Sequence, residues 1–314
     1  MLAYRLLTFV GNGGAKCPGL AVDDRLVDLT QEVGRRAETG QKIAFSAASQ
    51  MDVLENWDEA EPLLEEIAGD VEAGKLECLS LSDVELLAPL LYPTALFNAA
   101  ANYHAHVDEM MAKEFKVEQS DKQPYFFLKS PAHCVIGPGA EIPIPHVTQE
   151  MDWEAELAVV IGRHGRNLTP EEAPSIIAGY TIYNDLSARD LGRRPDWPNF
   201  KNDWFGQKVF EGAAPMGPWI IPAKAIADPS ELKIDLWVND EHMQDAKAGM
   251  MIFSPEEQIS YLSQRMTLRP GDVIATGTPA GVGKPRGIFL KPGDVVRVTI
   301  SEIGELSNPV TAGV

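Results

Sequence analysis

The sequence predicts a strand-rich α+β protein, in which a small α/β domain precedes a larger domain built mostly of strands. Three observations support this class. Apolar, β-branched runs bounded by Gly and Pro recur along the chain, helix-start signals are few, and the composition, 45% hydrophobic and 23% charged, is typical of globular proteins. Pro89 and Pro93 mark a join, so we predict domains at residues 1–90 and 91–314.

The first domain should contain two strands and a helix. Tyr4–Val10 and Leu20–Leu29 are the expected strands, on either side of a Gly-rich turn at residues 11–14. The segment Met51–Glu72 is acidic and has apolar residues at helical spacing. That pattern predicts a helix with a solvated, charged face.

The second domain should alternate strands with a few helices. Residues 152–162 and 179–185 predict strands, because both runs are apolar and β-favouring. Capping boxes with proline at the first helical position predict helices over 169–178 and 254–266. Further strands are expected at 232–238, 273–275 and 295–300. Two segments should be irregular, the first of them a mobile loop: residues 113–123 and 192–205.

The charge of the chain excludes several classes of partner. Lys plus Arg is 27 and Asp plus Glu is 46, which leaves a formal net charge of −19. Such a chain repels nucleic-acid backbones and anionic membranes, so neither should be a partner. Three scattered cysteines argue against a disulfide framework, and no apolar run approaches the length of a membrane span. The N-terminus does not resemble a signal peptide, so we expect a cytoplasmic protein.

Three carboxylates are candidates for a metal site. Glu154 and Glu156 are two residues apart in a predicted strand, so their side chains share one face about 7 Å apart. Asp185 ends a later apolar strand. Acids that face an apolar interior are costly unless a cation lies between them, and an all-oxygen site suits Mg²⁺, Mn²⁺ or Ca²⁺. The alternative is a pair of surface acids on an edge strand.

His106 and Glu109 are candidates for an acid–base pair. At positions i and i+3 of a helix, the carboxylate can orient the imidazole, raise its pKa and make it a base that activates water. Two alternatives stay open at this point. The pair could lie on the surface, or His104 and His106 could be metal ligands on a strand.

Two cations and a Gly-rich loop are further candidates. Lys208 lies among aromatic and apolar residues, so it needs an anionic partner; an ordinary surface lysine is the alternative. Arg189 would share a face with Asp185 if a helical turn follows, and could clamp a carboxylate. The loop at 276–283 lacks the Walker pattern, since Thr278 stands where glycine is needed. We expect its hydroxyls and amides to bind a carboxylate instead.

Taken together, these segments resemble the fumarylacetoacetate hydrolase family over about residues 95–310. The matching pieces are Asn-Tyr-x-x-His-x-x-Glu at 102–109, Phe-Leu-Lys-Ser-Pro at 127–131, Asp-Trp-Glu-Ala-Glu-Leu at 152–157, Tyr-Asn-Asp-Leu-Ser-Ala-Arg-Asp at 183–190, Gly-Gln-Lys at 206–208 and Thr-Gly-Thr-Pro-x-Gly-Val-Gly at 276–283. The resemblance implies a mixed β-sandwich roll, a homodimer, and Mg²⁺ or Mn²⁺ on Glu154, Glu156 and Asp185.

The resemblance also implies roles for single residues. His106 and Glu109 would activate water from a short lid helix, and Lys208 would stabilise a developing enolate. Substrate contacts would come from Tyr103, Lys129, Arg189, Gln207 and Thr278. Related proteins often carry glutamine three residues after the arginine, whereas this chain has Gly192. The irregular segment at 192–205 should therefore supply different contacts in that corner.

The activity implied is that of a metal-dependent hydrolase of aromatic catabolism. It would cleave a carbon–carbon bond in a 2,4-diketo acid, such as an acylpyruvate or fumarylacetoacetate, through a metal-bound enolate. Two alternatives use the same enolate: isomerisation of a 2-hydroxymuconate-type dienoate, and decarboxylation of oxaloacetate. A non-catalytic metabolite-binding protein is a remote alternative, because His106, Glu109 and Lys208 are all present.

Overall fold

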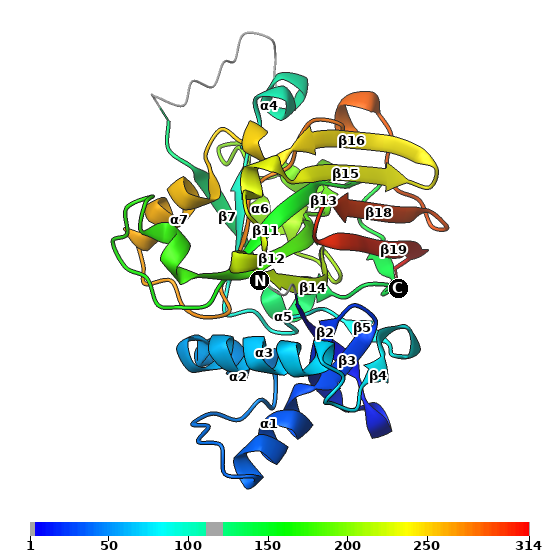
Figure 1. The fold of residues 1–314 in the computed structure, drawn as a ribbon. Coiled ribbons are helices and arrows are strands. Elements are labelled where there is room, and N and C mark those ends of the chain that lie inside the picture. Colours follow the sequence, from blue (N-terminus) through cyan, green and yellow to red (C-terminus); the bar gives the residue numbers. More distant parts are fainter. Residues whose placement is uncertain (1–3, 111–121, 314) are drawn as a thin grey trace.

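Strands dominate the computed structural model of this protein, which describes residues 4–110 and 122–313 (Figure 1). The α+β, strand-rich class is therefore confirmed. The expected mobile loop at 113–123 lies, apart from its last two residues, outside the described part.

The strands are β1 (Arg5–Val10), β2 (Lys16–Val22), β3 (Arg25–Asp28), β4 (Leu79–Ser80), β5 (Leu86–Leu87), β6 (Leu96–Ala100), β7 (Tyr125–Lys129), β8 (Val135–Ile136), β9 (Ile142–Ile144), β10 (Met151–Asp152), β11 (Ala155–Ile161), β12 (Ile177–Asn184), β13 (Ser187–Ala188), β14 (Ala214–Pro222), β15 (Lys233–Val238), β16 (Glu241–Lys247), β17 (Val273–Ala275), β18 (Val295–Ile300) and β19 (Gly304–Ala312). The α-helices are α1 (Leu29–Glu38), α2 (Gln50–Glu55), α3 (Trp57–Glu72), α4 (His104–Met110), α5 (Pro131–Cys134), α6 (Trp204–Lys208) and α7 (Pro255–Ser263).

Three sheets form among the described residues. The largest has the strand order β4-β3-β2-β1-β14-β12-β11-β17-β6-β7, with β5 beside β1 and β8 beside β14. A five-stranded sheet has the order β16-β15-β18-β19-β9, and β10 pairs with β13. Most pairings are antiparallel, but β17 runs parallel to β6, β19 to β9 and β14 to β8.

Strand β11 is buried on both faces because two hydrophobic clusters meet on it. Leu157, Val159 and Ile161 belong to a cluster that includes strands of the five-stranded sheet. Ala158 and Val160 belong to a second cluster, which includes residues of α2 and α3. A strand covered on both faces has a continuous apolar sequence rather than an alternating one. The packing therefore holds β11 in place from both sides, together with the side chains at the start of the strand.

The N-terminal strands share a sheet and a core with the rest of the chain. Strand β1 pairs with β14 at Leu6 and Ile220, and the second cluster contains residues from both sides of position 90. Figure 1 shows α1, α2 and α3 below the larger body. The division at residues 1–90 and 91–314 stays a prediction.

Two expected elements of the first domain are each split in two. The strand expected over Leu20–Leu29 is the end of β2 followed by β3, with a turn that places Asp23 at a φ of 52°. Helix α1, which we did not predict, begins directly after β3, where the side chain of Asp28 accepts a hydrogen bond from Gln31 N–H. The helix expected over Met51–Glu72 is α2 and α3, separated at Asn56.

One of the two predicted helices of the second domain is wrong. Residues 169–178 form a turn, a short 3₁₀ helix at Ala173–Ile176 and the start of β12. A second proline, Pro174, removes a backbone donor that an α-helix would need there. The capping box at Ser254 is confirmed and starts α7, which ends at Ser263. The strands expected near 232–238, 273–275 and 295–300 are confirmed as β15, β17 and β18.

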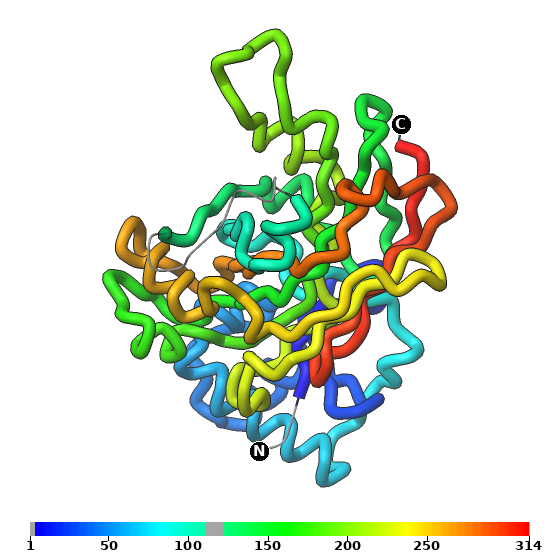
Figure 2. The backbone as a smooth tube through the Cα atoms, turned by 90° about the horizontal axis from the view of Figure 1, so that it is seen from above, coloured from blue at the N-terminus to red at the C-terminus, as the bar shows by residue number. Residues whose placement is uncertain are grey.

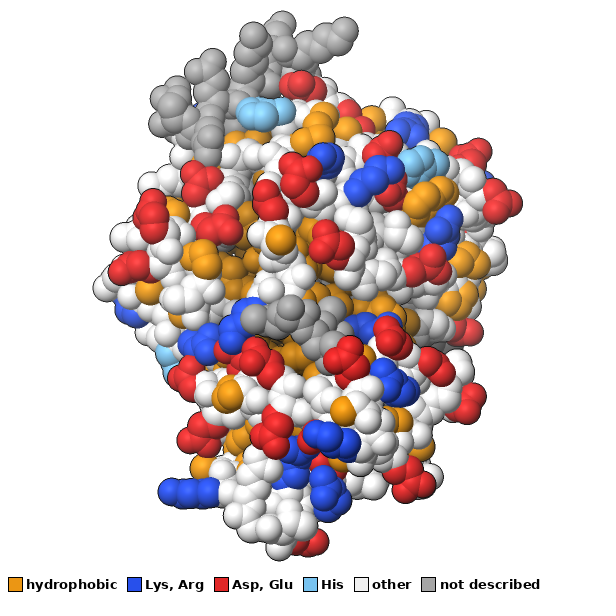
Figure 3. Space-filling view, viewed as in Figure 1, with side chains coloured by type: hydrophobic (Ala, Val, Ile, Leu, Met, Phe, Trp, Pro, Cys, Tyr) orange, Lys and Arg blue, Asp and Glu red, His pale blue; other side chains and the backbone are white. Residues whose placement is uncertain are grey.

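The segment between Gly192 and α6 projects from the body, and is yellow-green in Figure 2. Of the segment expected to be irregular, 192–205, residues 193–203 contain neither helix nor strand, whereas residue 192 ends a 3₁₀ helix and residues 204–205 begin α6. Figure 3 shows acidic and basic side chains interspersed over one face of the molecule. None of the helices in the described ranges combines the length and apolar character needed to cross a membrane.

Asp272 should make stability depend on pH. Burial raises the pKa of its carboxyl from 3.8 to about 6, and the side chain accepts a hydrogen bond from Arg269 N–H at 2.8 Å. The folded state binds this proton more tightly than the unfolded chain does. The protonated Asp272 therefore makes its full contribution to the free energy of unfolding below about pH 4, and this contribution is lost as pH rises through 6. We therefore expect Asp272→Asn to become steadily more stable relative to the wild type between pH 4 and 6, measured by urea unfolding.

The matched control is Asp294→Asn. Asp294 makes the same contact in a second Pro-Gly-Asp turn, to Lys291 N–H at 2.8 Å, but in an exposed setting. Its substitution should leave the pH dependence nearly as in the wild type. Equal slopes for Asp272→Asn and the wild type would contradict the assignment.

Candidate active site

Three carboxylates from the ends of two neighbouring strands form a buried cluster. Glu154 directly precedes β11, Glu156 lies within it, and Asp185 directly follows β12. Asp185 N–H donates to the carbonyl of Glu154 at 2.9 Å, which ties the two strand ends together. The exposed fractions of these residues are 5%, 1% and 0%, and one oxygen of each lies within 4.8 Å of the others. The alternative of surface acids on an edge strand is therefore wrong.

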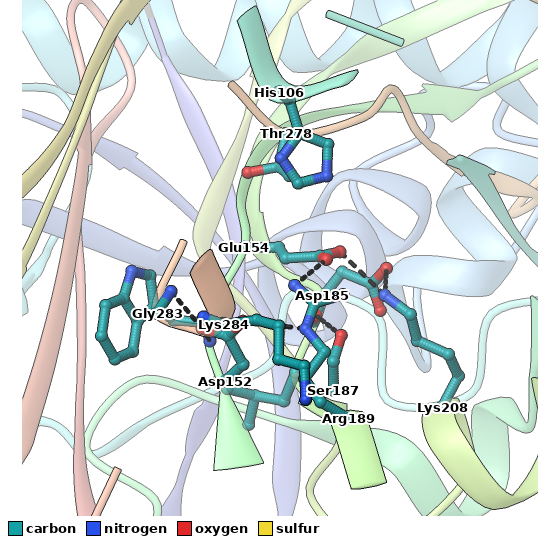
Figure 4. A network of polar contacts seen from close by, with 12 residues as sticks. His106, Asp152, Glu154, Asp185, Ser187, Arg189, Lys208, Thr278, Gly283 and Lys284 are labelled. Carbon is teal, nitrogen blue, oxygen red and sulfur yellow. Dashed lines mark hydrogen bonds and ion pairs between the residues drawn. The ribbon is translucent and has the colours of Figure 1, made fainter. Parts of the chain in front are cut away.

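Two buried lysines offset part of this negative charge. Lys208 Nζ donates to Glu154 Oε2 at 2.8 Å and to Asp185 Oδ2 at 2.6 Å, as Figure 4 shows. Lys129 Nζ lies 2.6 Å from Asp185 Oδ1 and also donates to two backbone carbonyls. Both lysines are at most 3% exposed, so the alternative of a surface lysine at position 208 is wrong.

Arg189 clamps two carboxylates of the protein itself. Its Nε donates to Asp152 Oδ2 at 2.8 Å, and its Nη2 donates to Glu154 Oε1 at 2.6 Å. The short strand β13, rather than a helical turn, separates it from the cluster, so the predicted helical face is wrong. Asp152, to which we assigned no role, also accepts hydrogen bonds from the amides of residues 283–284. The Gly-rich loop thus binds a carboxylate, but one that belongs to the chain.

Burial and neighbouring charges move the pKa values of the three acids apart. For Glu154, the cost of burial is outweighed by Lys208 and Arg189, so its pKa lies below the ordinary value. Burial, together with the charges of Asp185 and Glu154, raises the pKa of Glu156 well above its ordinary value. Burial also raises the pKa of Asp185, despite its lysine partners. The raised pKa values of Glu156 and Asp185 mean that these carboxyls tend to hold protons when no other cation is bound in the cluster.

The cluster fits a hard divalent cation in both charge and donor type. Glu156 Oε1 is buried and has no hydrogen-bond partner among the described residues, whereas its Oε2 accepts from Gly277 N–H at 2.8 Å. Enclosed carboxylates outnumber enclosed cations by four to three: Asp152, Glu154, Glu156 and Asp185 against Lys129, Arg189 and Lys208. With all four acids ionised, one negative charge would be uncompensated, which a bound proton or cation offsets. All candidate ligand atoms are oxygens, as Mg²⁺ and Mn²⁺ prefer.

His106 and Glu109 face this cluster from helix α4, and Figure 4 shows the imidazole above Glu154. The pairing predicted from helical spacing is present, since His106 Nδ1 lies 2.9 Å from Glu109 Oε1. The carboxylate of Glu109 also accepts from Gly281 N–H, at 3.0 and 3.1 Å. His106 is 8% exposed, whereas His104 is exposed on the same helix. A metal site on a strand and a surface pair are therefore both wrong.

A cavity of about 820 Å³ joins the histidine to the carboxylate cluster, and His106, Glu154 and Lys208 all line it. Of the predicted substrate contacts, the wall includes Arg189, Gln207 and Thr278 but not Tyr103 or Lys129. Both excluded side chains are buried, at 2% and 3% exposure. Lys129 is occupied by Asp185, so it supports the cluster rather than the contents of the cavity.

The cavity also has an aromatic wall that we did not predict. Phe127 and Trp204 stack with ring centroids 4.8 Å apart, and Tyr125 meets Trp204 edge-on at 5.9 Å. Aromatic residues at alternate positions of a strand were a signal, but their partner is far away in the sequence. In the corner where related proteins carry glutamine, a Cβ on Gly192 would lie 2.5 Å from Gln207 Oε1. Gly192 thus leaves the room that Gln207 occupies.

Comparison with known proteins agrees with this geometry. The family model for the fumarylacetoacetate (FAA) hydrolase C-terminal region matches residues 95–311. Oxaloacetate tautomerase fahd2, mitochondrial, of Xenopus laevis is 42% identical over 237 residues, 74% of this chain and 70% of that protein. Oxaloacetate tautomerase YisK of Bacillus subtilis (strain 168) is 41% identical over 238 residues, 74% of each chain.

A solved structure extends the likeness to the whole chain. The crystal structure of maleylpyruvate hydrolase from Sphingobium sp. SYK-6, in complex with manganese(II) and pyruvate, is similar with a TM-score of 0.75 and 29% identity. The likeness covers 99% of this chain and 100% of that one. The chain therefore belongs to the fumarylacetoacetate hydrolase family of enzymes.

Proposed function

We propose that this protein is a tautomerase that interconverts the enol and keto forms of oxaloacetate or a closely similar 2-oxo dicarboxylic acid. The observation that carries the proposal is a carboxylate-held histidine that shares one cavity with Glu154 of the buried acidic cluster. The two relatives named as oxaloacetate tautomerases support it, since each aligns with 74% of this chain. The hydrolase predicted from the sequence becomes the second candidate.

Keto–enol tautomerisation moves a proton between the oxygen on one carbon and the adjacent carbon, and needs neither water nor a redox partner. It requires a group that moves the proton and fixed positive charge near the oxygen that becomes negative. Glu109 occupies Nδ1 of His106, which leaves Nε2 as the ring atom free to take the proton from the enol oxygen and return it to the carbon, so that no proton is gained or lost overall. Because α4 positions both residues, the imidazole keeps its orientation while the proton moves.

Positive charge near the substrate oxygen comes from the opposite side of the cavity. Burial lowers the pKa of Lys208, but Asp185 and Glu154 raise it more, so the net shift is upward and the ammonium stays charged. Lys208 therefore acts as a fixed cation and not as a proton donor. Glu154, Glu156 and Asp185 would hold Mg²⁺ or Mn²⁺, which when bound supplies Lewis-acid charge to the oxygens of a 2-oxo acid.

The second candidate is hydrolysis of a carbon–carbon bond in a 2,4-diketo acid. One observation favours it: a cavity of about 820 Å³ with the stacked wall of Phe127 and Trp204 has room beyond a four-carbon acid. For that reaction, His106 would take the proton of an attacking water instead of serving a substrate carbon. The same residues thus support either reaction, and only the substrate that turns over separates them.

Substitution of His106 tests the proton transfer. After addition of the enol form of oxaloacetate, the loss of enol absorbance is followed with the spontaneous rate subtracted. His106→Ala should lower kcat about 10²- to 10⁴-fold while Mn²⁺ binding is retained, because the imidazole moves the proton but does not hold the ion. His104→Ala, on the exposed side of the same helix, is the control and should keep full activity.

Two outcomes would contradict this assignment. Wild-type protein that leaves enol decay at its spontaneous rate, yet cleaves an acylpyruvate, would replace the tautomerase by the hydrolase. Equal rates for His106→Ala and the wild type would remove the histidine from either mechanism.

Substitution of Glu156 tests the cation site. Because burial raises the pKa values of Glu156 and Asp185, binding of Mn²⁺ should release protons and tighten as pH rises. Glu156→Gln should weaken Mn²⁺ binding about 100-fold or more, since one anionic oxygen ligand is lost. The metal-free variant should unfold at an equal or higher temperature, because one of several repelling buried charges is gone.

Calorimetry in two buffers of different ionisation enthalpy measures the affinity and the released protons together. The exposed Glu305→Gln serves as control for the loss of a charge elsewhere. A lower melting temperature with unchanged Mn²⁺ affinity would place the cation outside this cluster.

A further inference from the structure

We propose that Arg193, with Asn202 beside it, forms a subsite for the distal carboxylate of a dicarboxylic 2-oxo acid. The subsite would make this protein select dicarboxylates over monocarboxylates of similar size. This inference rests on the proposed function, because it takes the carboxylate cluster and His106 as the reacting end of the cavity.

The backbone brings Arg193 and Asn202 together at the rim of the cavity. Arg193 follows the short 3₁₀ helix at Arg189–Gly192, where the projecting segment begins. The amide of Asp203 donates to the carbonyl of Gly192 at 2.9 Å and closes the base of that segment. The two ends of the segment are thereby held side by side. Arg193 and Asn202 both line the same cavity as His106 and Lys208.

The other lysine and arginine side chains of the cavity wall are already neutralised. Arg189 binds two carboxylates, and Lys208 lies between two of the cluster's acids. Lys284 forms an ion pair with Glu150. All three cations are therefore already paired with carboxylates of the protein.

Arg193 differs from all of them. Within the described ranges, its guanidinium has no hydrogen bond and no ion pair, and Asn202 has no side-chain hydrogen bond either. Its neighbour Arg194 is held instead by Asp196 at 2.5 Å and by Asp203 at 3.6 Å. One uncompensated guanidinium therefore stands at the rim of a cavity in a chain of net charge −19.

This charge suits a carboxylate, which a 2-oxo dicarboxylic acid carries at its far end. A guanidinium presents paired N–H donors that match the two oxygens of a carboxylate, and a carboxamide N–H can add a third contact. A substrate whose 2-oxo acid end lies at the buried cluster would meet Arg193 only with its far end. A monocarboxylate has no carboxylate at that end, so it would bind without the hydrogen bonds from Arg193.

Arg193→Gln tests the subsite by separating two substrates. With enol oxaloacetate, KM should rise about 10- to 100-fold with little change in kcat, because a charge-assisted hydrogen bond outside the reacting end is lost. With the enol of phenylpyruvate, a monocarboxylate, KM should stay within about twofold. Arg193→Lys should recover part of the affinity. Arg194→Gln, which removes an equal charge from the same segment but not from the cavity wall, should change neither value.

Binding supplies a readout that does not depend on turnover. Calorimetry with Mn²⁺ present should show that Arg193→Gln weakens malate, a dicarboxylate, about 10-fold or more while lactate is unaffected. If the wild type lacks tautomerase activity but this difference in binding persists, the proposed function fails and the subsite stands. Equal losses for malate and lactate, no loss for either, or the same loss in Arg194→Gln would each overturn the subsite.

Discussion

A buried excess of negative charge at the ends of β11 and β12 constrains the rest of the structure. An unpaired charge in a protein interior costs several kcal/mol, which is comparable to the whole stability of a domain. The chain keeps its four enclosed carboxylates by placing three cations and several backbone amides around them. Because two hydrophobic clusters hold β11 from both faces, these groups cannot separate to reduce their repulsion. The packing energy of the cores thus maintains a site that is electrostatically unfavourable until a cation binds.

The Gly-rich loop at 277–283 connects the parts of this site. Its amides donate to Glu156 at residue 277, to Glu109 at residue 281 and to Asp152 at residue 283. One loop therefore donates hydrogen bonds to a candidate metal ligand, to the partner of the histidine and to the partner of Arg189. A shift of this loop would move Glu109, the partner of His106, together with the acidic cluster. The same sequence pattern suggested an anion-binding loop, but its anions are side chains of the protein.

Local spacing was enough to predict the contacts that depend on a single element. The i and i+2 spacing of Glu154 and Glu156, and the i and i+3 spacing of His106 and Glu109, each bring two side chains to one face. Contacts between distant segments were harder to predict. Nothing near Lys129 in the sequence indicates that Asp185 occupies it, and Asp152 gained its role only because β13 carries Arg189 alongside.

Errors in the predicted elements had the same origin. The helix expected at 169–178 had a start signal, but Pro174 and the pairing of β12 with β11 leave a turn, a short 3₁₀ helix and the start of a strand there. The aromatic wall shows the limit most clearly, since Phe127 and Trp204 stack only after β7 and α6 have come together. Burial of an element end and contact across sheets are products of the whole fold, so spacing within one segment does not predict them.

The hydrogen bond between Gly281 and Glu109 also makes the orientation of the histidine depend on a glycine far from it in the sequence. Gly281 has a φ of 113°, and a Cβ there would lie 2.0 Å from the carbonyl oxygen of Met243, so no other residue fits. A hydrogen bond of this charge-assisted kind is worth about 1.5–3 kcal/mol. Val107 of the same helix is buried against Ile252 and Phe253, so α4 is held to the body by packing as well as by this hydrogen bond. A residue at position 281 other than glycine would therefore displace Glu109, and with it the orientation of the His106 imidazole, without touching either side chain directly.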